Sequence, residues 1–84
     1  MSFKHLNLKE VSLEQIRSDC RNLEEGFGLN DKVYYRQFIT DYQMVRIRKF
    51  NKNGFPLIDV YMSSYNSWKE IKNAWKYFLY EEVK

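Results

Sequence analysis

The stretch from residue 44 to residue 62, MVRIRKFNKNGFPLIDVYM, decides the fold because two β-type runs flank a single turn signal. Asn53-Gly54 favours a tight hairpin, whose central positions need positive φ. We therefore expect strands over 43–50 and 56–62. A two-residue turn pairs Ile47 with Val60, whereas a four-residue loop pairs Ile47 with Ile58. The registers differ by two, so both leave each side chain on the same face.

The alternation in this hairpin predicts one apolar and one mixed face. The expected core face is Val45, Ile47, Ile58, Val60 and Met62, with Lys49 at its edge. The expected outer face is Met44, Arg46, Arg48, Phe50, Leu57, Asp59 and Tyr61.

The outer face is the main functional candidate, because arginines contact phosphates and aromatic rings stack on unpaired bases. We expect Arg46 and Arg48 beside Phe50 and Tyr61. Further expected members are Tyr34 and Arg36 on the neighbouring strand, and Lys49 and Lys52 toward the turn. Two alternatives remain open. Asp59 pairs with the arginines across the hairpin while the rings cover their stems, or the face binds a protein.

Upstream of the hairpin, residues 33–39 (VYYRQFI) read as a strand. Residues 12–25 read as a helix, with Ser12 and Gln15 as a capping box and Val11 and Ile16 as a hydrophobic staple. Its apolar stripe is Leu13, Ile16, Cys20, Leu23 and Phe27, and Gly26 and Gly28 would end it. Residues 1–10 are expected to form a mobile arm or a short strand.

Downstream, residues 68–82 are expected to form a second helix capped by Ser67 and Glu70. Its stripe would be Trp68, Ile71, Trp75, Phe78 and Leu79. Lys69, Lys72 and Lys76 would share another side, either as a solvated row or as an extension of the basic patch. Tyr77 and Tyr80 fall off the stripe and are candidates for a partner interface.

Together these elements predict a single α+β domain over residues 1–84. Its order would be (β)-α-β-β-β-α, with an antiparallel three-stranded sheet and both helices packed on one face. That arrangement would leave the other sheet face open to water or to a partner.

Composition narrows the function classes. With one cysteine and one histidine, the 84-residue chain can form no internal disulfide and cannot complete a zinc site of the usual type. We find no phosphate-loop motif and no plausible catalytic constellation, and so expect a non-enzyme without cofactor or metal. No signal-peptide or membrane-span pattern is present, which favours the cytoplasm and no membrane contact.

Net charge is +3, but residues 32–76 carry nine Lys or Arg against three Asp or Glu. Such clustering steers anionic partners. We therefore expect RNA or another polyanion as the partner, with a protein-only interaction or a homodimer as the alternative.

Two resemblances add expectations. The α-β-β-β-α order is similar to a double-stranded-RNA-binding domain, although Gly54-Phe55-Pro56 lacks the histidine of that family's Gly-Pro-x-His loop. That family's lysine cluster would correspond to Lys69, Lys72 and Lys76. In size and AT-rich coding character, with 34 residues of Lys, Asn, Tyr, Phe or Ile, the chain also resembles small early anti-defence proteins of T-even-type phages. This second resemblance implies an inhibitor of a host nuclease or toxin, acting in the host cytoplasm through RNA, a protein–RNA complex or a protein alone.

Overall fold

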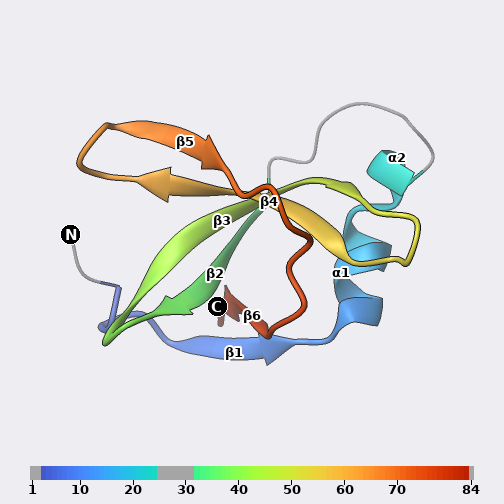
Figure 1. The fold of residues 1–84 in the computed structure, drawn as a ribbon. Coiled ribbons are helices and arrows are strands. Elements are labelled where there is room, and N and C mark those ends of the chain that lie inside the picture. Colours follow the sequence, from blue (N-terminus) through green and yellow to red (C-terminus); the bar gives the residue numbers. More distant parts are fainter. Residues whose placement is uncertain (1–2, 25–31, 84) are drawn as a thin grey trace.

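A computed structural model describes residues 3–24 and 32–83, drawn in colour in Figure 1. The strands are β1 (Leu8–Val11), β2 (Val33–Phe38), β3 (Asp41–Phe50), β4 (Pro56–Met62), β5 (Ser67–Glu70) and β6 (Leu79–Glu82). The helices are α1 (Leu13–Asp19) and α2 (Arg21–Glu24).

The strands form one six-stranded antiparallel sheet in the order β1-β6-β2-β3-β4-β5. The last strand, β6, lies between β1 and β2, and it meets β2 through the pair Tyr35 and Tyr80. The sheet is strongly curved, so that the β4–β5 hairpin and the β1–β6 pair lie at opposite sides of the molecule (Figure 1). Helix α1 lies near the loop between β3 and β4 (Figure 1).

The expected hairpin forms, with the register of the longer loop, since Ile47 pairs with Ile58. In the loop, the Asn51 side chain accepts hydrogen bonds from the backbone N–H groups of Asn53 and Phe55, at 3.0 and 2.9 Å. Gly54 adopts a φ of 86°, while Asn53 does not adopt positive φ. The prediction of a turn with positive φ at both residues was therefore wrong, because the Asn51 side chain organises a wider loop.

A β-bulge in β3 reverses the expected facing near the loop. The register shifts between Ile47 and Lys49, so that Lys49 pairs with Leu57 and Phe50 pairs with Pro56. One inserted residue moves every later side chain to the other face. Phe50 therefore packs against the core, and Lys49 lies exposed on the outer side. Both were predicted on the opposite sides.

The helix expected over 68–82 was wrong. Residues 67–70 form β5 against β4, residues 71–78 follow an irregular path, and residues 79–82 form β6. The irregular segment stays against β4, because the backbone N–H groups of Ile71 and Trp75 donate to Ile58 and Pro56 at 3.0 and 2.8 Å. The unpaired edge of β4 needs such partners, and aromatic residues favour extended structure.

Because residues 68–82 do not form a helix, the predicted α+β class was also wrong. The fold of the described residues is mainly an antiparallel sheet, with helical structure confined to residues 13–24. A three-stranded sheet with two helices packed on one face is not formed, and the order of a double-stranded-RNA-binding domain is absent. The hydrophobic stripe of residues 68–79 had the spacing of a helix, but its members separate: Trp68 lies under Arg46, Leu79 lies in the core and Phe78 is largely exposed.

The first helix is shorter than predicted but begins where expected. Ser12 caps α1, accepting a hydrogen bond from the Gln15 backbone N–H at 3.1 Å. The Gln15 side chain donates to Asp19 instead of returning to the cap. Ile16 and Cys20 lie in the core, as their spacing predicted. The expected helix end at Gly26 and Gly28, with Phe27 on its stripe, lies outside the described residues.

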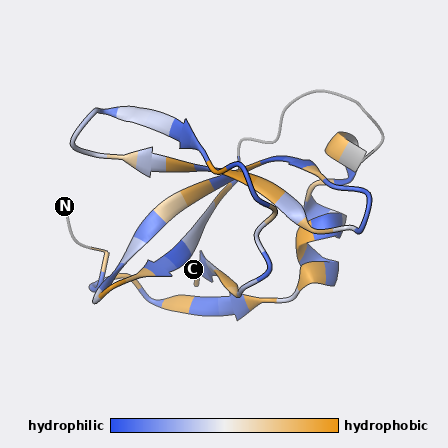
Figure 2. Cartoon of the chain, viewed as in Figure 1, coloured by the Kyte–Doolittle hydropathy of each residue, from blue (hydrophilic) through white to orange (hydrophobic). Residues whose placement is uncertain are grey.

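The core fills the concave side of the sheet beneath α1. It consists of Val11, Ile16, Cys20, Tyr34, Val45, Ile47, Ile58, Val60 and Leu79. Met62 packs partly against this core, so all five residues of the predicted core face contribute to it. Figure 2 shows the corresponding alternation of hydrophobic and hydrophilic residues along the strands.

A polar network joins α1 to the sheet. The Lys32 ammonium lies 2.7 Å from Asp19 and 2.9 Å from Glu81, while the Tyr34 hydroxyl donates to Asp19 at 3.0 Å. Burial alone would raise the pKa of Asp19, but hydrogen bonds from Lys32, Gln15 and Tyr34 outweigh it and hold that pKa below its usual value. The hydrogen bond from Lys32 likewise lowers the pKa of Glu81.

Candidate partner-binding surface

The outer arginine cluster, defined as Arg46, Arg48, Asp59 and Glu70, occupies the convex face of β3, β4 and β5. Asp59 lies 3.4 Å from Arg46 and 3.1 Å from Arg48. Arg48 also reaches Glu70 at 3.1 Å. Two carboxylates therefore neutralise two guanidinium groups, as in the sequence alternative that paired the arginines with Asp59.

Aromatic rings complete the cover of this cluster. The Arg46 guanidinium lies 4.4 Å from the ring centroid of Trp68, and Tyr61 packs edge-on against Trp68. The Tyr61 hydroxyl hydrogen-bonds Asn66. These cation–π and hydrogen-bond contacts use the donors and ring faces that a nucleic acid would require.

The neighbouring strand does not extend that face. Tyr34 pairs with Val45, and its side chain has 0% exposed surface. Arg36 shares the concave side with Tyr34, where its guanidinium lies 4.9 Å from the Trp75 ring and bonds Gln43 at 2.7 Å. Burial lowers the pKa of Arg36. The expectation that Tyr34 and Arg36 lie beside Arg46 was wrong, because register across β2 and β3 sets the facing.

The predicted lysines are exposed, but they do not form one row. Lys49 and Lys52 lie at the β3–β4 loop end, Lys69 in β5, and Lys72 and Lys76 in the irregular segment. In the described part of the chain, no carboxylate pairs with any of these five lysines. The loop end, where residues 71–75 run along β4 toward Pro56, therefore keeps more uncompensated positive charge than the arginine cluster.

The aromatic segment, defined as residues 71–78, presents large rings to solvent. Tyr77 is 77% exposed and Phe78 is 67% exposed. The Tyr77 ring packs edge-on against Trp75, with centroids 5.1 Å apart. Two neighbouring aromatic rings exposed to water are energetically unfavourable unless another surface covers them, and such patches mark interaction sites.

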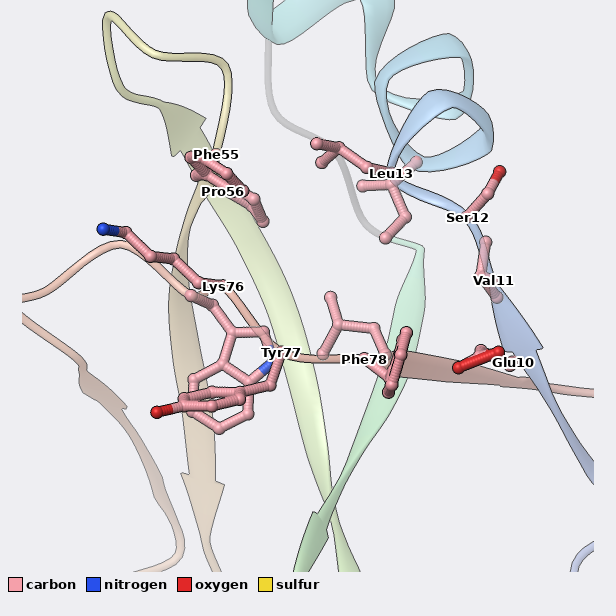
Figure 3. A pocket seen from close by; sticks show the side chains of 12 residues that line it. Glu10, Val11, Ser12, Leu13, Phe55, Pro56, Lys76, Tyr77 and Phe78 are labelled. Carbon is pink, nitrogen blue, oxygen red and sulfur yellow. The ribbon is translucent and has the colours of Figure 1, made fainter.

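On one side of these rings lies the anchor hollow, about 500 Å³ in volume. Figure 3 shows Phe55 and Pro56 facing residues 10–13 across it, with Lys76, Tyr77 and Phe78 along a third side. The core residues Val11, Ile16 and Leu79 also line it, so the hollow reaches the hydrophobic core.

The side hollow, about 390 Å³, is lined by Gln37, Ile39, Trp75, Tyr77, Phe78 and Tyr80. Trp75, Tyr77 and Phe78 line both hollows and form the wall between them. The structure thus brings Tyr77 and Tyr80, both predicted at an interface, to one hollow. Tyr80 is half-buried and packs edge-on against Tyr42.

Ile39 is the most unusual residue of this surface. It occupies the tight turn between β2 and β3 with a φ of 55° and is 79% exposed. A β-branched residue in this region is strained, typically by about 1–3 kcal/mol. The Ile39 side chain is exposed despite this strain, so it does not stabilise the core.

Sequence reasoning missed Ile39, Phe55, Leu13 and Phe78 as surface candidates. Phe78 and Leu13 were assigned to helix stripes, so their spacing concealed the exposure of Phe78 and the place of Leu13 on the wall of the anchor hollow. A signal for Ile39 was present, since a β-branched residue between a strand and the expected turn at Asp41 departs from normal turn chemistry. No comparable sequence signal marked Phe55.

The described residues contain no group of three or more side chains suited to hold a metal ion. Cys20 is fully buried and His5 is exposed. Nor does any helix within residues 3–24 and 32–83 have the length and apolar character needed to cross a membrane.

No protein-family model, curated protein or solved structure matches the chain.

Proposed function

We propose that this protein is a small, non-enzymatic, sheet-based binding module that acts by docking a protein partner. The contact surface is the aromatic segment with its two hollows. The observation that carries the proposal is the joint exposure of Tyr77, Phe78 and Ile39 around adjoining hollows. Interfaces are enriched in aromatic residues at their centres, and hot spots cluster in such pockets.

A protein-docking surface favours the hypothesis of an inhibitor that binds a protein alone over that of an inhibitor that acts through RNA. The arginine face, which motivated RNA, has its charges paired with Asp59 and Glu70. By contrast, Tyr77 and Phe78 are largely exposed. Inhibition of a host nuclease or toxin remains a proposal that follows from the phage-like character of the sequence.

A nucleic-acid partner stays a second candidate because of the lysines at the loop end. Lys49, Lys52 and Lys76 have no carboxylate partner in the described part of the chain. Phosphate contacts give an affinity that falls steeply with salt, whereas an apolar interface does not. Salt dependence therefore discriminates between the two candidates.

The test is partner capture from lysate of the producing cells by the tagged protein and by the double variant Tyr77→Ser/Phe78→Ser. The matched control is Tyr65→Ser, because Tyr65 is 74% exposed in the β4–β5 turn and lines neither hollow. We expect the double variant to lose a protein that Tyr65→Ser retains, with capture unchanged by nuclease or by moderate salt. Equal capture by the double variant refutes the proposal, and loss on nuclease treatment transfers support to the second candidate.

A further inference from the structure

The charge distribution around the anchor hollow indicates which partner chemistry it accepts. Residues 49–58 and 71–80, which supply the β3–β4 loop and the aromatic segment, contain four lysines and no acidic residue. Lys76 lines the hollow, with its ammonium 5.8 Å from the Phe55 ring centroid. Among the described residues that line the hollow, Glu10 is the acidic one.

The hollow has an apolar floor, and its charged lining residues are Lys76 and Glu10. Val11, Ile16 and Leu79 at the floor are each at most 5% exposed, so they belong to the packed core. Leu13 and Phe55 add apolar walls. A cavity that opens onto the core suits one large apolar side chain, while the lysines outside it attract neighbouring negative charge.

A hydrogen-bond donor beside the hollow also lacks an acceptor among the described residues. The indole N–H of Trp75 is covered, and residues 3–24 and 32–83 offer it no hydrogen-bond partner. A buried donor left unsatisfied destabilises the free protein. Tyr77, whose ring packs against Trp75, is itself largely exposed. A shift of that ring would open the indole N–H to a carboxylate or carbonyl oxygen of a bound chain.

We propose that the anchor hollow binds an acidic peptide segment of the partner protein, with one large apolar side chain inserted against the core and carboxylates facing Lys76 and the lysines of the β3–β4 loop and the aromatic segment. This inference deepens the proposed function, on which it rests. Charge complementarity favours an acidic occupant, because Lys52, Lys72 and Lys76 attract acidic residues, whereas a second copy of this chain carries a net charge of +3. The apolar floor offers no partner for phosphate groups.

The test uses synthetic peptides and the two tryptophan indole resonances in a ¹H–¹⁵N correlation spectrum. The probe is a capped decapeptide with a central Phe flanked by Glu and Asp. Its comparators replace Phe with Ala, or every acidic residue with Gln, and a ten-nucleotide oligouridylate forms the nucleic-acid arm. Trp68 lies on the convex face under Arg46 and serves as the internal reference. The variant Trp68→Phe assigns the two signals.

We expect the acidic probe to shift the Trp75 indole signal and leave that of Trp68 in place. Each comparator peptide, and the variant Lys76→Glu, should bind about tenfold more weakly. The matched control Lys69→Glu removes a lysine of β5 that lines neither hollow, and it should bind nearly normally.

Three outcomes overturn the inference. In the first, the acidic probe leaves Trp75 unshifted. In the second, the oligouridylate shifts Trp75 at lower concentration than the peptide does. In the third, sedimentation shows that the protein is a homodimer, the variant Lys76→Glu dissociates this dimer, and the acidic probe leaves the spectrum unchanged. If Tyr77→Ser/Phe78→Ser abolishes partner capture while the acidic probe fails to bind, only this inference fails and the proposed function stands.

Discussion

The outer arginine cluster with the ring of Trp68, and the aromatic segment with its lysines, both combine cationic and aromatic side chains, but the two regions leave these side chains in opposite physical states. On the convex face, Arg46 and Arg48 are paired with Asp59, and Arg46 lies over the ring of Trp68. In the aromatic segment, Tyr77 and Phe78 are mostly exposed beside hollows. Residue type therefore does not identify a binding surface. A binding surface is identified by the charged groups and aromatic rings that the fold leaves exposed.

The difference follows from how each region is built. The convex face lies on a regular ladder, where cross-strand neighbours such as Arg46 and Asp59 stand opposite each other and pair. The aromatic segment has no such ladder, although two of its backbone N–H groups bond to β4. The side chains of the aromatic segment therefore have no cross-strand neighbours at fixed positions, and several of them face water.

The largest expected effect tests whether the anchor hollow shares its floor with the core. Leu79 is 1% exposed and lines the hollow, so Leu79→Ala should lower the free energy of unfolding by about 2–5 kcal/mol. Urea denaturation monitored by fluorescence measures this loss. A loss below about 1 kcal/mol would show that the hollow is separate from the core.

The next effect tests whether the convex face is sealed by carboxylates. Asp59→Ala leaves Arg46 without a carboxylate partner and Arg48 with Glu70 alone, and it should cost about 1–3 kcal/mol of stability. It should also delay elution from heparin at low salt, because the negative charge that offsets the two arginines is halved. Asp59→Asn, which keeps the size and some hydrogen bonding, should cost less stability. Unchanged heparin retention in both variants would contradict the sealed face.

A smaller effect of opposite sign tests the strained turn. Ile39→Gly removes the side-chain clash at positive φ, and the net rise in stability should be about 0.5–1 kcal/mol after the entropy cost of glycine. The same variant should weaken partner binding, because the exposed side chain borders the side hollow. Thermal unfolding and partner capture together measure this trade-off. A variant that is both more stable and fully active would exclude Ile39 from the interface.

The smallest effect concerns pH. The pKa values of Asp19 and Glu81 are lowered in the folded protein, so their contribution is present above pH of about 4.5 and is lost as pH falls through their folded pKa values. Lys32 has a raised pKa, and its contribution is lost only at pH above about 10.5. Lys32→Met should therefore flatten the acid-side loss of stability between pH 5 and about 3. Because Lys32 is more than a third exposed, we expect less than about 1 kcal/mol at pH 7.

The corrected assignments each have a local physical cause. The facing of Phe50 and Lys49 depended on one inserted residue in β3, and no sequence pattern marks which hairpin position bulges. The facing of Tyr34 and Arg36 depended on the β2–β3 register. The helix over 68–82 was wrong although its apolar residues have helical spacing, because residues 67–70 pair with the open edge of β4 instead.

By itself, the sequence determined the hairpin, its apolar face, the cap at Ser12 and the position of Cys20 in the core, because these depend on neighbours close along the chain. Tertiary structure alone decided the six-stranded order, the contact of Arg48 with Glu70 and the exposed aromatic segment. Those features depend on which strand edge meets which distant segment. That choice is made by pairing free backbone groups and burying the shared core, and it leaves no periodic trace in the sequence.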